Sequence, residues 1–366
     1  MKLDNPATKG HAAVSADAFW PELRDLLFQL GHLQAICCPD SHSHEEESRT
    51  SPFNADLKKT YERLSAGITF AQFDSIKSNQ IGELAYAWAE GRPPAFDFDP
   101  RRVLSGDPNG WSERYYIVTA DNPFISDERL RQVRAAAHAN IGRLFLEIWT
   151  KEKQTFEYWY EFERTGFQGY LLTAIAKHGQ ERAEAVRSFR SGEEPSLDVL
   201  DKILPSFAEQ IAKGIEEIML SSKNGVVRAP ETQGELVKSF FQQNRIADAP
   251  FVKLQSLMVA AMAMRAAQGQ KDPPNRGTVT DIDTVAHLLP YCDAMFMDNG
   301  CRSLLLDVPS ALRPADAGKM FSLNVKKEFL GYLRSIRDGI SSEQAQAIRD
   351  VYGDGYVQGL PGAGQG

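Results

Sequence analysis

The chain has 366 residues, of which 42% are hydrophobic, 25% charged and 10% aromatic. These values are typical of a globular protein large enough for one or two domains. The formal net charge of −8 disfavours non-specific attraction to nucleic acid or acidic membranes, although a local basic groove is compatible with it. No apolar run approaches the roughly 18 residues of a membrane span, and no apolar leader follows Met1. We therefore expect a cytoplasmic protein with no membrane partner.

The first part of the chain predicts a mixture of strands and helices. Residues 1–3 form at most a strand fragment that ends at Asp4. An amphipathic helix is expected from Asp17 to Gly31, followed by a short buried strand over 33–38. Three further helices follow, the first capped by Ser41 and the others at about 54–66 and 74–90.

The middle of the chain predicts helices only. The Pro- and Gly-rich stretch 91–112 marks a boundary. Beyond it, apolar residues recur at helical spacing over 126–150, 156–177, 196–222, 232–244 and 250–268, and a second Gly/Pro loop covers 269–277. We expect four segments: 1–95 and 275–340 as the two parts of one α/β domain, 110–270 as an inserted helical region, and 353–366 as a disordered tail.

The last part returns to an α/β pattern that is rich in aspartate. A helix opens with Asp281 and Asp283, and a short apolar strand, 294–297, lies between Asp293 and Asp298. A second strand at 320–325 and a helix at 326–338 follow. Carboxylates at the carboxyl end of a strand face the crevice where open α/β sheets bind ligands. Several carboxylates that converge there favour a hard divalent cation.

Three stretches carry a resemblance to a known family. Pro39, Ser41, His44 and Glu47, at the spacing Pro-x-Ser-x-x-His-x-x-Glu, resemble the second acidic motif of a bacterial PIN-like group of nucleases. Asp281, the run Leu-Pro-Tyr-Cys-Asp that ends at Asp293, and Asp298 resemble its third and fourth motifs. Met-Phe-Ser at 320–322, followed by Glu328-Phe329-Leu330, resembles the last strand and helix.

The resemblance implies a fold, a site and a reaction. The fold is a PIN-like three-layer α/β domain with a parallel sheet, interrupted by the large all-helical insertion. The reaction is hydrolysis of phosphodiester bonds in RNA, or in DNA, through a bound Mg²⁺ or Mn²⁺. The implied catalytic and metal-binding residues are Asp4, Glu47, Asp281 and Asp298, with Asp293 as a further ligand and with His44 and Asp283 contacting substrate or supporting the ligands.

The start of the chain departs from the family pattern and leaves an alternative open. Only three residues precede Asp4, whereas a PIN-like fold opens with a longer apolar strand. Either Asp4 ends a stunted strand, or the chain begins downstream of the real motif and the metal site is incomplete. In the second case the protein is a catalytically eroded binding module, whose helical insertion docks a protein or nucleic-acid partner.

Three weaker patterns offer other functions. His42 and His44 near Cys37 and Cys38 suggest zinc, but the spacing favours reduced, buried thiols. Arg131 and His138 faintly resemble the Arg-x6-His motif of HEPN ribonucleases. The aromatic residues between Phe156 and Phe162 suit base stacking, although helix packing is the simpler interpretation.

Overall fold

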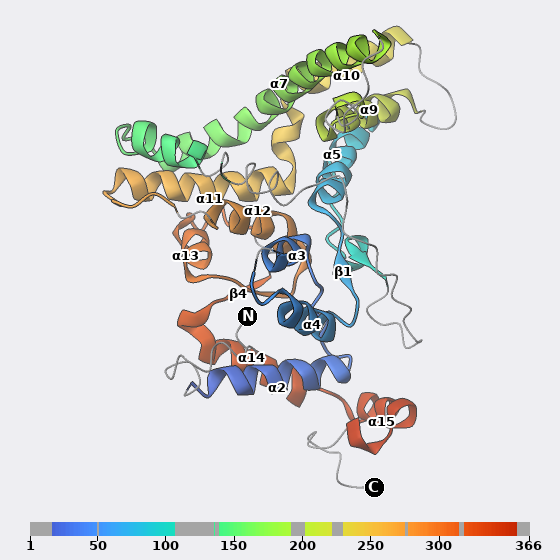
Figure 1. The fold of residues 1–366 in the computed structure, drawn as a ribbon, viewed down its shortest axis with the longest axis vertical. Coiled ribbons are helices and arrows are strands. Elements are labelled where there is room, and N and C mark those ends of the chain that lie inside the picture. The colour runs from blue at the N-terminus through green and yellow to red at the C-terminus, as the bar shows by residue number, and fades with distance from the viewer. Residues whose placement is uncertain are drawn as a thin grey trace.

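The computed structural model describes residues 17–49, 51–106, 135, 139–191, 202–221, 230–274, 277–314 and 318–356, and most of these are helical (Figure 1). The principal helices are α2 (Phe19–His32), α3 (His42–Arg49), α4 (Asn54–Ser65), α5 (Phe73–Glu90), α7 (Phe156–Arg190), α9 (Phe207–Leu220), α10 (Pro230–Gln242), α11 (Pro250–Ala267), α12 (Thr278–Leu288), α13 (Asn299–Asp307), α14 (Lys326–Asp338) and α15 (Ser342–Tyr352). Asp4 and most of the predicted tail lie outside the described residues.

The strands of the described residues form two small sheets. β1 (Thr69–Phe70) pairs antiparallel with β2 (Leu104–Ser105), and β3 (Ala294–Phe296) pairs parallel with β4 (Lys319–Phe321). The prediction of a three-layer PIN-like domain around a parallel sheet is therefore wrong. The described part of the chain is mainly helical and has no such sheet core.

The run 33–38, predicted as a buried strand, is a turn followed by irregular chain. Leu33 is fully buried against α15, and Ala35 and Ile36 pack against the buried cluster that α2 and α14 form with Phe321 of β4. The run therefore buries its apolar side chains without joining a ladder, an arrangement that apolar pattern alone cannot tell from a strand. For the same reason 33–38 and 294–297 do not pair as parallel strands.

Helices cover both faces of the β3–β4 pair (Figure 1). Phe296 and Phe321 pack on one side with apolar residues of α2 and α14. Met295 and Met320 pack on the other side with α11, α12 and α13. Side chains alternate between the faces of a strand, so even three-residue strands reach both helical layers.

The two ends of the described chain meet in the layer of α2 and α14. Four residues of α2 and three of α14 share one buried cluster: Phe19, Leu23, Leu26 and Leu30 with Phe329, Leu330 and Leu333. At its edge, Lys326 Nζ lies 2.5 Å from Asp17 Oδ2, and Arg334 pairs with Glu22. Segments that are about 300 residues apart in sequence thus pack together.

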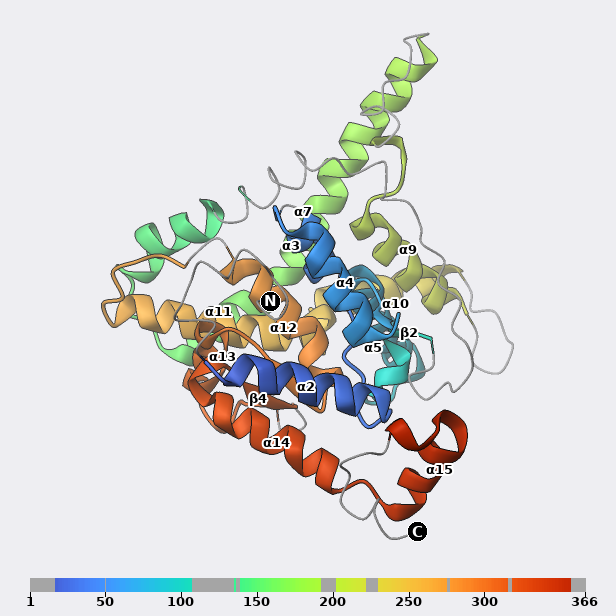
Figure 2. The same ribbon diagram turned by 60° about the horizontal axis from the view of Figure 1, so that its bottom comes forward.

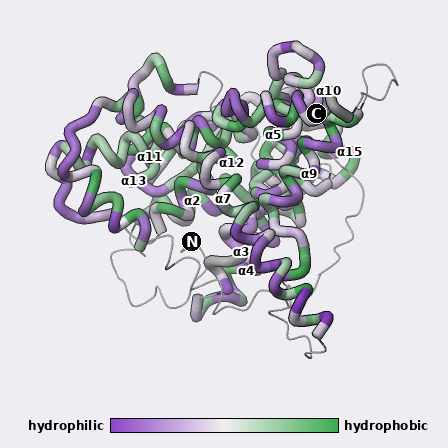
Figure 3. Tube along the Cα trace, turned by 90° about the horizontal axis from the view of Figure 1, so that it is seen from above, coloured by the Kyte–Doolittle hydropathy of each residue, from purple (hydrophilic) through white to green (hydrophobic). Residues whose placement is uncertain are grey.

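The remaining helices are organised around α11, most of whose residues are buried. A helix that is apolar on all sides belongs in a core, and α11 packs against α7 on one side and α12 and α13 on the other. α5 packs against α9 and α10. The C-terminal end of α7 extends away from the other helices (Figure 2). Both hydrophobic and hydrophilic residues occur along the described helices (Figure 3).

Candidate metal centre

Asp281 enters the site from the first turn of α12. The helix begins at Thr278, and the Asp281 backbone N–H donates to the carbonyl oxygen of Gly277 at 2.9 Å. The positive end of the helix dipole stabilises a carboxylate in this turn. The Asp281 side chain is half-buried, so it is held close to the protein surface and not extended into solvent.

Asp298 enters the site from the N-terminus of α13, directly after β3. It is the N-cap of this helix, and its Oδ1 accepts a hydrogen bond from the Cys301 N–H at 2.6 Å. Aspartate is a preferred N-cap because its carboxylate satisfies a backbone donor that the helix leaves free. Capping alone would account for this residue, so its neighbours decide whether it also has a chemical role.

Asp281, Asp298 and Cys301 form one cluster. Their ligand atoms, one carboxylate oxygen from each aspartate and the Cys301 Sγ, all lie within 4.8 Å of one another. Cys301 is buried, and its burial together with the nearby charges of Asp281 and Asp298 raises the pKa of its thiol far above the usual range. The thiol therefore keeps its proton as long as no cation lies between the carboxylates.

Asp281, Asp298 and Cys301 supply three donor atoms of kinds that divalent cations bind. A side chain at Gly300 would place its Cβ 3.2 Å from Asp298 Oδ1, so glycine keeps this edge of the carboxylate open. Carboxylates suit Mg²⁺ and Mn²⁺, whereas a thiol suits softer ions. The set of two carboxylates and one thiol therefore fits Mn²⁺ better than Mg²⁺.

Two of the predicted aspartates lie outside this cluster. Asp293 is exposed at the start of β3, where its carbonyl oxygen accepts from the Lys319 N–H at 2.8 Å. Asp283 Oδ1 lies 3.4 Å from His287 Nδ1, and the Asp283 carbonyl oxygen lies 2.6 Å from the same nitrogen. Asp283 thus contacts a buried histidine of its own helix.

The predicted residues of the second motif lie on α3, which contacts α12. Ser43 Oγ and Thr284 Oγ1 lie 2.8 Å apart and join the two helices one turn from Asp281. His44 pairs with Asp40, with 3.3 Å between Nδ1 and Oδ1, and stacks on the ring of Tyr61. Glu47 belongs to α3, but its side chain lies outside the described part of the chain.

The alternative sites have no counterpart in the described residues. Among the described residues, only Asp281, Asp298 and Cys301 bring three such donors together, so His42, His44 and the adjacent cysteines do not form a zinc site. Arg131 and His138 lie outside the described residues.

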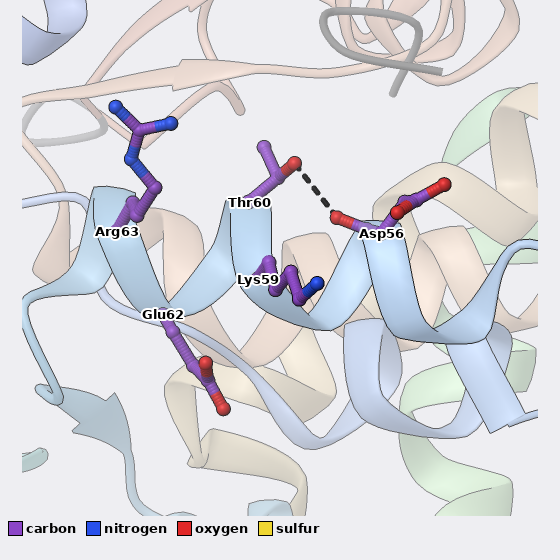
Figure 4. Close-up of a pocket in the computed structure, with 5 residues that line it drawn as sticks. All are labelled: Asp56, Lys59, Thr60, Glu62 and Arg63. Atoms are coloured by element: carbon purple, nitrogen blue, oxygen red, sulfur yellow. Dashed lines mark hydrogen bonds between the residues drawn. The ribbon is translucent and has the colours of Figure 1, made fainter. Parts of the chain in front are cut away.

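A hollow on the surface of α4 lies between Asp56, Lys59, Thr60, Glu62 and Arg63 (Figure 4). All of these come from one helix, and none belongs to the cluster.

Cys301 is the member of the cluster that the sequence analysis missed as a ligand. Its spacing of three residues after Asp298 was a usable indication, because the third helical position faces the N-cap. The buried His287 was also missed, and its four-residue spacing after Asp283 is too common on helices to single it out.

The chain matches no protein-family profile, no curated protein and no solved structure. The resemblance to PIN-like nucleases therefore rests on its sequence motifs. Within the described residues, no helix combines the length and the apolar character needed to cross a membrane.

Proposed function

We propose that this protein is a metal-dependent nuclease that hydrolyses phosphodiester bonds in RNA, with Asp281 and Asp298 holding Mn²⁺ or Mg²⁺. The observation that carries the proposal is the convergence of their oxygens with Cys301 Sγ within 4.8 Å. Like charges at such separations raise each other's energy unless a cation lies between them. A divalent cation supplies Lewis-acid stabilisation of the charge on a phosphodiester and on the attacking water.

The proposed roles of the protein groups follow from their positions. Asp281 and Asp298 supply the negative charge, and buried Cys301 closes the site from the protein side. Glu47 and Asp4 remain predicted ligands that would complete the set. We place the protein in the cytoplasm, where its four free cysteines would stay reduced.

The substitution Asp281→Asn tests this function, because it keeps the shape of the side chain and removes its charge. We expect Mn²⁺ affinity, measured by titration calorimetry, to fall about 100-fold or more. Mg²⁺- or Mn²⁺-dependent cleavage of single-stranded RNA should be lost with it. The melting temperature without metal should stay the same or rise, since the substitution removes a carboxylate repulsion. Asp272→Asn, at an exposed position outside the cluster, is the control and should change neither metal binding nor cleavage.

A second candidate function is that of a binding protein whose helices dock a protein or nucleic-acid partner. Tyr158, Phe162 and Tyr170 of α7 are 43%, 53% and 75% exposed, and the rings of Tyr158 and Phe162 stack with 6.2 Å between centroids. Exposed aromatic residues are enriched in protein interfaces. This candidate would replace the nuclease if the unaltered chain binds no Mn²⁺ in calorimetry and cleaves neither RNA nor DNA.

A further inference from the structure

Arg302 lies one turn after Asp298, the N-cap of α13. Its N–H donates to the carbonyl oxygen of Asp298 at 3.1 Å, within the first turn of α13. Its side chain turns to β4, where Nε donates to the carbonyl oxygen of Met320 at 3.0 Å. The guanidinium group is therefore anchored at one nitrogen and half-buried.

The charge of Arg302 has no carboxylate partner among the described residues, and Nη1 and Nη2 make no hydrogen bond there. Arg265, which packs against the same helix, does have such a partner. At the opposite end of α13, Arg265 Nε lies 2.5 Å from Asp307 Oδ2. A guanidinium presents a planar fork of donors that matches the oxygens of a phosphate. Because only Nε is used, the outer edge of the Arg302 fork remains available for an anion.

Arg302 belongs to α13, the helix that follows β3, and its side chain reaches β4. β3 and β4 are parallel, so their carboxyl ends lie at the same edge of the pair. Asp298 follows β3 at this edge. The Asn324 N–H, shortly after β4, donates to Asn299 Oδ1 at 3.0 Å, which fixes the chain after one strand against the chain after the other.

We propose that Arg302 binds a phosphate of the substrate next to the cation held by Asp281 and Asp298. The inference rests on the proposed function for the identity of the substrate, a single-stranded RNA, and adds the residue that recognises its phosphate. A chain with a net charge of −8 repels a polyanion over most of its surface. A fixed guanidinium that has no carboxylate partner among the described residues, on the helix that Asp298 caps, provides the local attraction that such a substrate needs.

Binding of a fluorescein-labelled single-stranded RNA in EDTA, followed by anisotropy over a series of salt concentrations, tests this role without metal. Arg302→Gln should weaken binding by about tenfold, as expected for a charge-assisted contact. It should also reduce the slope of log affinity against log salt by about one. Arg302→Lys keeps the charge without the fork and should bind with intermediate affinity. The melting temperature of each variant reports whether the loss of the bond to Met320 alters the fold.

Arg313→Gln is the matched control. Arg313 follows the same helix, and its guanidinium also donates to backbone carbonyl oxygens, those of Val308 and Leu306. It lies at the end of α13 away from the cluster, so its removal should leave RNA affinity unchanged. Equal losses in Arg302→Gln and Arg313→Gln, or no RNA binding by the unaltered protein, would overturn the inference.

Mn²⁺ calorimetry on the same variants separates this inference from the proposed function. We expect Arg302→Gln to bind Mn²⁺ as the unaltered chain does, because Arg302 is no ligand. If the unaltered chain binds no Mn²⁺ while RNA binding still depends on Arg302, the nuclease proposal fails and the phosphate contact stands. If Mn²⁺ binds and RNA affinity does not depend on Arg302, only the proposed phosphate contact is contradicted, and the proposed metal site stands.

Discussion

Glu163 on α7 is a carboxylate that folding leaves half-buried without a partner among the described residues. It makes no hydrogen bond or ion pair with the described residues, and burial raises its pKa from 4.5 to about 7. The folded state therefore binds a proton at Glu163 more tightly than the unfolded state does. The stability that depends on this proton is complete below pH 4.5 and is lost as the pH rises through 7.

Glu163→Gln should therefore stabilise the protein above pH 7 and have little effect at pH 4.5. A shift from 4.5 to about 7 corresponds to a gain on the order of 1–3 kcal/mol in the free energy of unfolding. Urea unfolding at pH 4.5 and pH 8 measures it. Glu184→Gln, at an exposed position of the same helix, should change stability by less than about 0.5 kcal/mol at both pH values. Equal stability of Glu163→Gln and the unaltered chain at pH 8 would contradict the prediction.

The sequence indicated the aspartates of the site better than their surroundings. Asp281 and Asp298 could be predicted because each lies next to an element with a clear local pattern, the start of a helix and the end of a short apolar strand. Cys301 could not be predicted as a neighbour of Asp281, since α12 and α13 meet only through tertiary packing. Asp293 belongs to the same motif, yet it is exposed at the opposite end of β3 from Asp298.

At the scale of elements, α5, α11 and α12 meet around His287. The imidazole is fully buried between the rings of Phe73 and Phe251, with centroids 4.8 and 5.1 Å away. Its Nε2 has no hydrogen-bond partner in the described structure. Burial lowers the pKa of His287 and Lys77 adds to this, whereas Asp283 and Asp74 oppose it. The three helices therefore pack around a neutral ring.

Acidification should weaken this junction. Because the pKa of folded His287 lies below the usual 6.5, its contribution to stability is present above pH 6.5 and is lost as the pH falls below that value. His287→Phe keeps a flat ring between Phe73 and Phe251 and cannot bind a proton. Its unfolding midpoint in urea should fall less between pH 7 and pH 5 than that of the unaltered chain. An equal fall of the unfolding midpoint in the two proteins would show that His287 does not titrate in this range. His32→Gln, at an exposed position, serves as the control.

Helices were predictable at this scale, and the sheet was not. The expected helices at 54–66, 74–90 and 326–338 agree closely with α4, α5 and α14, since helical periodicity is a local property. The prediction of a strand at 33–38 was wrong because a strand needs a hydrogen-bonding partner that is distant in the sequence. The strand predicted at 294–297 agrees closely with β3, because β4, which follows α13, supplies its pairing partner.

At the scale of the whole molecule, helices from the middle of the chain share a hydrophobic core with helices from its first and last parts. α11 covers the apolar side of α12 and α13, and α9 and α10 cover α5. The sequence predicted that 110–270 is an insertion into a separate α/β domain. In the structure, the inner faces of α12 and α13 are buried together with α11, which belongs to that insertion.

Excision of 110–270, with a Gly/Ser linker in its place, should therefore leave a chain that does not fold. It would expose five residues of the cluster around α11: Ile282, Val285, Leu304, Leu305 and Val308. At about 1.5–3 kcal/mol for each side chain, the loss is comparable with the roughly 5–15 kcal/mol of a whole domain. Calorimetry should show no cooperative transition. Removal of α15 onwards is the control, because α15 buries only a small cluster of Leu33, Ala345 and Ile348, and that chain should still unfold cooperatively. A cooperative transition in the excised chain would mean instead that the two ends form an independent domain that does not need α11.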